Sequence, residues 1–247
     1  MPSLLQFLLL LIAGIAAGLG GSIAGIASVF SYPALLAVGL SPIDANVTNS
    51  ISLFFLSAGS IIGSRREIKG RGALLKKLAP TNLIGGVIGA MLLLLTPSTT
   101  FKHIVPFLLL AASIAILVPG KANPDGEPRV HIHVMQILAA LIGIYCGYFG
   151  AASGSMTLAL LIQTLGVGLP VANALKNVLL GISNGIAAII FIFTGHVHWL
   201  MAIPLGIGFF IGGRTGPIIV RHASQKILRR CVSVFGGMVS IYLLIHL

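Results

Sequence analysis

Long stretches of this sequence contain no charged residue, and they decide what the chain can fold into. They are Leu4–Ala17, Ile51–Ile62, Leu83–Leu95, Ile104–Val118 and Ile186–Phe193. A bilayer core about 30 Å thick needs about 20 mostly apolar residues per crossing helix. Closed β-barrels also span membranes, but their strands alternate apolar and polar residues, unlike the continuous block Met91–Leu95. The sequence therefore predicts an all-α polytopic membrane protein that lies in a lipid bilayer.

The charged residues agree with this class of protein. They make up 8% of the chain, against roughly 25% in a soluble domain, so they are too few to cover a water-facing globule. The net charge of +11 would suggest nucleic acid in a soluble protein. Here the basic residues cluster at the ends of apolar stretches, where the preference for cytoplasmic Lys and Arg explains them. No nucleic-acid partner is expected.

The sequence is internally duplicated. The glycine pattern Gly18-x-x-Gly21-x-x-x-Gly25 recurs as Gly147-x-x-Gly150-x-x-x-Gly154. Further matches follow in the same order at nearly the same offset: Gly39-Leu40 with Gly168-Leu169, Ala45-Asn46 with Ala172-Asn173, and Pro80 with Pro204. We predict two transmembrane repeats, residues 1–118 and 134–247, joined by a polar hinge at residues 119–133.

Each repeat is predicted to hold a glycine-broken hairpin followed by three transmembrane helices. The hairpins are Leu4–Val38, broken at Gly18–Gly21, and His133–Val167, broken at Gly147 and Gly150–Gly154. The helices are about Ile43–Gly63, Pro80–Leu95 and Lys102–Val118, then Val171–Thr194, Leu200–Val220 and Arg230–His246. Because the hairpin arms are short for full crossings, each hairpin is either re-entrant or a pair of thin crossings.

The basic loops predict that the two repeats are inverted. Ser64–Lys77 and Arg221–Arg230 are both rich in Lys and Arg, so both should be cytoplasmic. The first precedes the third element of its repeat and the second follows it, which requires opposite orientations of the repeats. The loops Thr96–Thr100 and Gly195–His198 hold no Lys or Arg and are expected outside.

The glycine breaks are the expected place of a binding site. Irregular backbone at membrane depth is tolerated only where it is buried in protein or lines a watery cavity, and paired breaks in inverted repeats mark transporter sites. Close helix packing is the other interpretation, which we favour for Gly85, Gly89, Gly212 and Gly213. Polar neighbours favour binding at the breaks, by Gly20, Gly21, Ser22, Gly150, Ser153 and Ser155.

A second polar cluster begins the helix after each hairpin. Helix N-termini present free N–H groups and hold anions, so we predict further substrate ligands: Asn46, Thr48, Asn49, Asn173, Lys176 and Asn177. Helix capping is the alternative for Asn46 and Asn173. Lys176 either extends to the membrane surface or contacts an anion, because a buried cation without a partner is costly. Asp44 is the candidate for proton coupling, with ion pairing or helix capping as alternatives.

No motif in the sequence indicates catalysis, a cofactor or a metal. The pairs His131-x-His133 and His196-x-His198 have no accompanying cysteine or carboxylate cluster, which a metal site would need. No Ser/His/Asp arrangement, phosphate-binding loop or carboxylate pair is found. We therefore expect neither enzyme activity nor a bound cofactor.

Taken in order, these motifs resemble the TauE/SafE (TSUP) family of sulfite exporters, over nearly the whole chain. The first repeat reads Gly18-Leu-Gly-Gly21, Pro33, Gly39-Leu-Ser-Pro42 and Ala45-Asn-Val-Thr-Asn49. The second reads Gly147-Tyr-Phe-Gly150, Gly168-Leu-Pro170 and Ala172-Asn-Ala-Leu-Lys-Asn177. It departs from the family pattern at Ile162, the counterpart of Pro33, and at Lys176, where members commonly have a small residue.

The resemblance implies a secondary transporter in the bacterial cytoplasmic membrane. It would move a small sulfur-containing anion, such as sulfite, sulfoacetate or another organosulfonate, with coupling to protons. Two alternatives stay open: an anion channel that uses the same centre, and a transporter of a different small solute such as an amino acid. The residues themselves predict inverted repeats and an anion-binding centre, and sulfur follows only from the resemblance.

Overall fold

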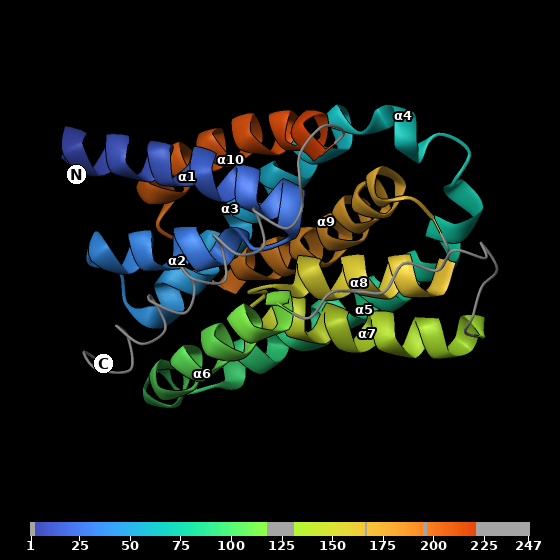
Figure 1. The fold of residues 1–247 in the computed structure, drawn as a ribbon. Coiled ribbons are helices and arrows are strands. Elements are labelled where there is room, and N and C mark those ends of the chain that lie inside the picture. The colour runs from blue at the N-terminus through green and yellow to red at the C-terminus, as the bar shows by residue number, and fades with distance from the viewer. Residues whose placement is uncertain (1–2, 118–130, 166, 195–196, 221–247) are drawn as a thin grey trace.

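The computed structural model describes residues 3–117, 131–165, 167–194 and 197–220, which form a bundle of helices (Figure 1). In chain order these are α1 (Leu4–Ala24), α2 (Ala27–Ala37), α3 (Pro42–Gly63), α4 (Arg65–Ile68), α5 (Gly72–Leu95), α6 (Ser98–Leu117), α7 (Ile132–Tyr148), α8 (Ser153–Leu165), α9 (Leu169–Thr194) and α10 (Trp199–Val220). Five are long and apolar enough to cross a membrane: α1, α3, α5, α9 and α10. The prediction of an all-α membrane protein is confirmed.

Some predicted segments fall outside the described residues. They are the basic loop Arg221–Arg230, the last helix Arg230–His246 and most of the hinge at 119–133.

Local capping groups explain where two of the helices begin. Ser3 caps α1, because its hydroxyl accepts from the Gln6 N–H (3.2 Å) while its own N–H donates to Gln6 Oε1 (2.9 Å), the reciprocal pair of a capping box. Ser41 accepts from the Asp44 N–H in the same way. Pro42 takes the first position of α3, where the missing N–H leaves no hydrogen bond unmade.

The start of α5 corrects the prediction made from Pro80. The helix begins at Gly72 and continues through the proline, which removes one backbone donor. The carbonyl left without its helical N–H is that of Lys76. In the same turn, the Thr81 hydroxyl donates to Leu78 O (2.8 Å), and Gln136 of α7 donates to Lys77 O (3.0 Å). Helix α6 also begins earlier than predicted, at Ser98.

The break in the first hairpin is not where it was predicted. Helix α1 continues through Gly18, Gly20 and Gly21 and ends at Ala24, so the chain turns at Gly25 and Ile26. In the second hairpin, α7 includes Gly147, and the turn runs from Phe149 to Ala152. The returning arms α2 and α8 have 11 and 13 residues, too short to cross the bilayer core.

The glycines within the helices serve close packing instead. Four matched pairs lie where α1 crosses α10 and where α7 crosses α5: Gly14 with Gly208, Gly18 with Gly212, Gly143 with Gly85 and Gly147 with Gly89. A Cβ at Gly89 would lie 2.0 Å from Ile144 O, so only hydrogen fits. The packing interpretation of Gly85, Gly89, Gly212 and Gly213 is confirmed, and small residues are the usual means of close helix approach in membranes.

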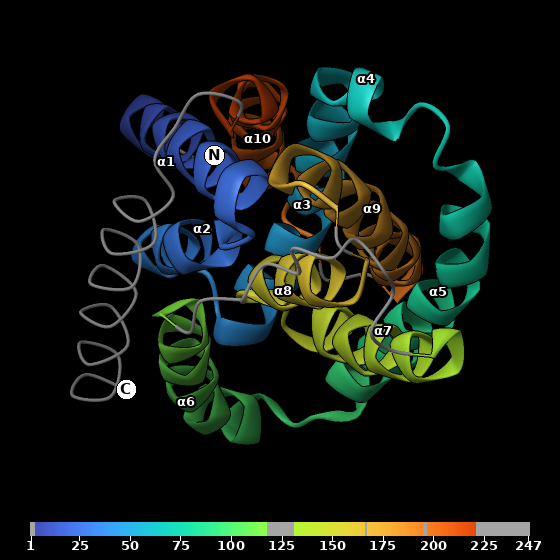
Figure 2. The same cartoon turned by 45° about the vertical axis from the view of Figure 1, so that its right-hand side comes forward.

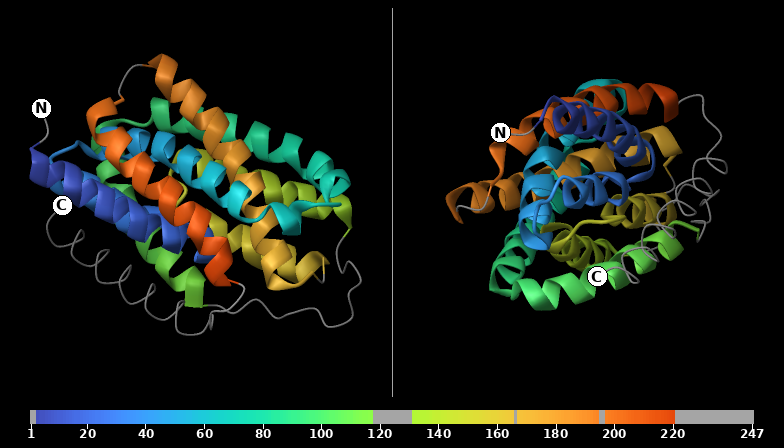
Figure 3. Two further views of the ribbon diagram at one scale, coloured as in Figure 1. Left: turned by 90° about the horizontal axis from the view of Figure 1, so that it is seen from above. Right: turned by 90° about the vertical axis from the view of Figure 1, so that its left-hand side faces the viewer.

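These crossings divide the bundle into two groups of parallel helices. One group is α1, α3 and α10, and the other is α5, α7 and α9. Within each group the helices are parallel, because the residue numbers of successive contacts rise along both helices of a pair. Figure 3 shows α1 beside α10 and α5 beside α7. The two groups meet where Gly181 of α9 lies against Ser57 of α3, and Figure 2 shows α3 and α9 at the centre. Thus the first arm of each hairpin packs on a helix of the other repeat.

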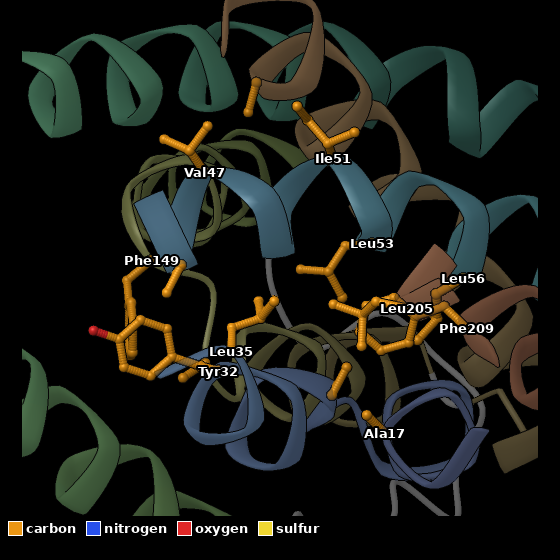
Figure 4. Packing of buried hydrophobic residues seen from close by; sticks show 14 of the residues in the cluster. Ala17, Tyr32, Leu35, Val47, Ile51, Leu53, Leu56, Phe149, Leu205 and Phe209 are labelled. Carbon is orange, nitrogen blue, oxygen red and sulfur yellow. The ribbon is translucent and has the colours of Figure 1, made fainter. Parts of the chain in front are cut away.

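A buried apolar cluster holds the first hairpin against α3 and α10 (Figure 4). Ala17 of α1 packs among Leu53 of α3 and Leu205 of α10. On the other side of the hairpin, the rings of Tyr32 and Phe149 meet edge to face with centroids 5.3 Å apart, a favourable aromatic geometry. The cluster fixes the hairpin on both sides of its turn.

Candidate functional site

The first break depends on Gly25. This residue has φ +78° and ψ 33°, the left-handed conformation that glycine adopts without a steric penalty. Its N–H donates to Gly21 O (2.8 Å) and ends α1. A Cβ here would lie 2.2 Å from the carbonyl carbon of Gly154. Position 25 therefore requires glycine both for its backbone conformation and for its contact.

The second break brings Gly154 to the same point. The chain turns through Gly150 (φ +77°) and Ala152 (φ +58°), and the hydroxyl of Ser153 donates to Gly150 O (2.8 Å) as α8 begins. Backbone contact between Gly25 and Gly154 then joins the two hairpin tips near the middle of the molecule (Figure 1).

The backbone carbonyls at the end of each hairpin's first arm accept hydrogen bonds from side chains of the other half of the chain. Lys176 of α9 donates to Gly21 O (3.0 Å) and Ser22 O (3.1 Å) at the end of α1. Asn46 of α3 donates to Tyr148 O (2.8 Å) at the end of α7. The last carbonyls of a helix lack partners within it and carry partial negative charge, so a cation and an amide suit them. Lys176 is fully buried, which excludes extension of its side chain to the membrane surface.

A small polar cavity lies where the two hairpins meet α3 and α9. Its lining residues are Gly21, Gly25, Ala27, Ser28, Leu53, Leu56, Ser57, Gly150, Ser153, Asn177, Leu180 and Asn184. The centre of a water molecule can occupy about 20 Å³ of it, enough for one water and too little for a larger solute. Both short helices, α2 and α8, begin at this cavity, and the residue before α2, Ile26, provides no side-chain cap.

Two polar side chains of this cavity, Asn177 and Ser57, have no hydrogen-bond partner among the described residues. The amide nitrogen and the oxygen of Asn177 are both buried, as is the Ser57 hydroxyl. Buried polar groups in proteins are nearly always paired, and leaving one unpaired costs about 1–3 kcal/mol. The unpaired amide therefore indicates a place that a polar ligand completes.

Asn49, the residue that matches Asn177 in the first half of the chain, has hydrogen-bond partners for its amide. Asn49 accepts from Ser31 Oγ (2.6 Å) and donates to Ser28 Oγ (3.0 Å), so its amide holds α2 against α3. In the second repeat the positions of these two serines hold Thr157 and Leu160, and the Thr157 hydroxyl bonds to Ser153 O (2.8 Å) in its own helix. Equivalent asparagines thus have different surroundings.

The predicted ligands divide into those that line the cavity and those that lie around it. Four line it: Gly21, Gly150, Ser153 and Asn177. The others are not among the lining residues: Gly20, Ser22, Asn46, Thr48, Asn49, Ser155, Asn173 and Lys176. Lys176 stays adjacent to the cavity, because its acceptor Gly21 forms part of the wall.

Three lining residues, Ser28, Ser57 and Asn184, are not among the predicted ligands. A signal for Asn184 was present, since it follows Asn177 by seven residues and so lies on the same helix face. Ser57 follows Ser50 by the same spacing.

Asp44 lies away from this cavity, at the start of α3. Its carboxylate accepts from Ser41 Oγ (2.7 Å) and lies 3.6 Å from His198 Nε2. The side chains of Asp44 and His198 are 24% and 48% exposed. Asp44 therefore lies in the first turn of α3, where Ser41 is the capping residue, and its carboxylate lies near the ring of His198.

A bundle of membrane-crossing helices in which two broken segments meet at a buried polar cavity is the architecture of a membrane transporter. The chain belongs to the sulfite exporter TauE/SafE family, whose sequence profile matches residues 10–243. It is a multi-pass transporter of the bacterial inner membrane.

Several bacterial relatives are described as probable membrane transporter proteins. ORF9 of Sinorhizobium sp. is 33% identical over 95% of this chain and 91% of its own length. YfcA of Escherichia coli strain K12 is 29% identical over 92% of this chain and 86% of its own. YunE of Bacillus subtilis strain 168 is 22% identical over 96% of this chain and 98% of its own length. No solved structure gives a significant match to the chain.

Proposed function

We propose that this protein is a secondary transporter that moves a small sulfur-containing anion, such as sulfite or an organosulfonate, through the cavity between the two broken hairpins. The observation that carries the proposal is the unpaired Asn177 amide at the beginnings of α2 and α8. An oxyanion accepts hydrogen bonds, and the amide donates two. Helix N-termini add backbone N–H groups and positive dipole ends.

The charges near the cavity favour an anion over a zwitterion. No carboxylate is among the lining residues, so a substrate ammonium group would find no counter-charge there. The Lys176 ammonium lies behind Gly21 and has a third N–H beyond the two bound to carbonyls. A sulfonate therefore suits the described part of the site better than an amino acid does.

The small volume of the cavity supports alternating access over a channel. Space for one water is far from a continuous pore, so a sulfonate enters only if the hairpins separate. We propose that the two repeats are inverted and rock about the Gly25–Gly154 contact, which is how transporters with such repeats expose a fixed site. The parallel course of α3 and α10 supports the inversion, because the helices that precede the two basic segments in the sequence then end at one face.

A flux panel in proteoliposomes tests the proposal. Purified protein is supplied in turn with sulfite, sulfoacetate, isethionate, taurine, sulfate, chloride and alanine. We expect saturable uptake of one or more of the sulfur anions that depends on a proton gradient. Chloride flux that does not saturate and ignores the proton gradient would indicate a channel, and uptake of alanine alone would indicate a different solute.

Cysteine labelling tests the proposed orientation. In a variant without Cys146 and Cys231, we expect Val197→Cys to react with an impermeant maleimide in intact cells. Lys69→Cys and Gln225→Cys should react only after permeabilisation, because both replaced residues belong to basic segments. Reaction of the latter two in intact cells would contradict the inversion.

Substitution of Lys176 tests whether its ammonium contacts the anion. Losing one charge-assisted hydrogen bond is worth about 1.5–3 kcal/mol, so Lys176→Ala should weaken binding of the transported anion about tenfold to 150-fold. Isothermal titration in detergent measures this, with the exposed Lys76→Ala as the control that should bind like the parent. An affinity within about twofold of the parent's would leave the backbone N–H groups as the main anion donors.

A further inference from the structure

Lys176 is the one charged residue that is fully buried within the described part of the chain. Its nitrogen bonds to the carbonyls of Gly21 and Ser22, and no carboxylate pairs with it among the described residues. An enclosed ammonium without an opposite charge is costly. The charged form of Lys176 becomes favourable when an anion lies beside it. Without an anion, the neutral amine has the lower free energy in this buried place.

The two carbonyl bonds are compatible with either form of this side chain. An ammonium has three N–H donors, of which two reach Gly21 O and Ser22 O and one remains for a ligand. A neutral amine has two N–H donors, enough for the same two carbonyls. Loss of the proton therefore removes the charge and the third donor together, and leaves the support of α1 intact.

We propose that Lys176 carries the coupled proton, taking it up as the anion binds and releasing it with the anion on the other side. This inference rests on the proposed function and reassigns the coupling role from Asp44, which lies at the surface beside His198. One proton then moves with each anion in the same direction. Transport of a monovalent anion is consequently electroneutral.

Other ionisable groups lie on the described helices that pack against α9. Of the helices packed against it, α1 and α8 carry no ionisable side chain. The remaining ones carry Asp44 on α3, Arg65, Arg66 and Glu67 on α4, Lys76 and Lys77 on α5, His133, Tyr145, Cys146 and Tyr148 on α7, and Arg214 on α10. Cys146 comes near the cavity, through its contact with Asn184 (3.5 Å). Within the described part of the chain, the hydrogen bonds of the Lys176 nitrogen go to the carbonyls of Gly21 and Ser22.

The test compares the parent with Lys176→Arg, Lys176→Met and Asp44→Asn in proteoliposomes loaded with a pH indicator. Isethionate is the probe, because its sulfonate stays monovalent across the usable pH range. In the parent, an isethionate gradient should move protons in the same direction, and the apparent affinity should fall as pH rises. Asp44→Asn should keep both properties.

The arginine variant separates charge from proton transfer, because arginine keeps its proton throughout this range. It should retain measurable isethionate exchange with an affinity independent of pH, while proton movement falls to the level of protein-free liposomes. The methionine variant should lose both, and size-exclusion profiles verify that each variant is folded.

Three outcomes decide between the proposals. Proton movement by the arginine variant, or its loss in Asp44→Asn, would overturn the role of Lys176 and leave the transporter proposal standing. Voltage-dependent isethionate flux in the parent would likewise contradict electroneutral coupling. Absence of isethionate and all other sulfur-anion flux in the parent would overturn the proposed function, and this inference with it.

Discussion

Replacing Gly25 by alanine is expected to destabilise the protein by about 2–5 kcal/mol. The left-handed backbone at this position costs a residue with a Cβ about 1–2 kcal/mol. The added carbon would also lie 2.2–2.4 Å from backbone atoms of Gly154, and overpacking of this kind costs about 1–3 kcal/mol more. Together these terms are a large part of the stability of a typical domain, about 5–15 kcal/mol. Thermal unfolding in detergent, followed by size-exclusion chromatography, measures the loss.

Two matched variants separate the causes. Gly39 has φ +96° with no atom within 4 Å of the added carbon. Gly39→Ala should therefore cost only the free energy of the left-handed backbone. Gly154→Ala carries the contact alone, because its Cβ would lie 2.3 Å from Gly25 Cα and its φ is not positive. Equal unfolding temperatures for Gly25→Ala and Gly39→Ala would show that the two hairpin tips are not in contact.

Asn177→Leu should reduce transport at least about tenfold without lowering stability. Asn49→Leu should instead lower the stability of the protein. The side chains are similar in size. At position 177 the leucine replaces two unpaired buried atoms, which is neutral or stabilising. At position 49 it takes away the amide that bonds to Ser28 and Ser31. Ser31 keeps its bond to Ala27 O (3.1 Å), and the Ser28 hydroxyl loses its donor, at about 1–3 kcal/mol for a buried group left unpaired.

The measurements are the unfolding temperature in detergent and the uptake rate in proteoliposomes. Each hydrogen bond lost to a bound anion is worth about 1.5–3 kcal/mol, so uptake by Asn177→Leu should fall at least about tenfold. Parent-like uptake by this variant would remove Asn177 from the site. Destabilisation equal to that of Asn49→Leu would mean that the amide at 177 is paired within the protein.

Several features of this protein follow from its sequence. The membrane class depends on the apolarity of each segment, and the match between Gly18–Gly25 and Gly147–Gly154 predicts a duplication. The family follows as well, because its motifs are runs of adjacent residues such as Gly39-Leu-Ser-Pro42. All of these are local properties, so no knowledge of distant contacts is needed to find them.

The position of the first break could not be read from the sequence. Gly18, Gly20, Gly21 and Gly25 all permit a turn, and a run of glycines does not say which of them takes it. In the structure Gly18 lies against Gly212 of α10 and stays helical, while Gly25 meets Gly154 and turns. The choice is made by the helix that packs against each glycine.

The partners of the polar residues were also decided by the tertiary structure. Asn49 and Asn177 occupy equivalent places in the two repeats, but only Asn49 meets two serines from α2. Lys176 binds carbonyls 154 and 155 positions away along the chain. The hydropathy of a segment is a sum over its own residues, so it can be calculated from the sequence. Whether a buried polar atom is paired depends on which distant segment lies beside it, and that is fixed only when the hairpins of the two repeats come together.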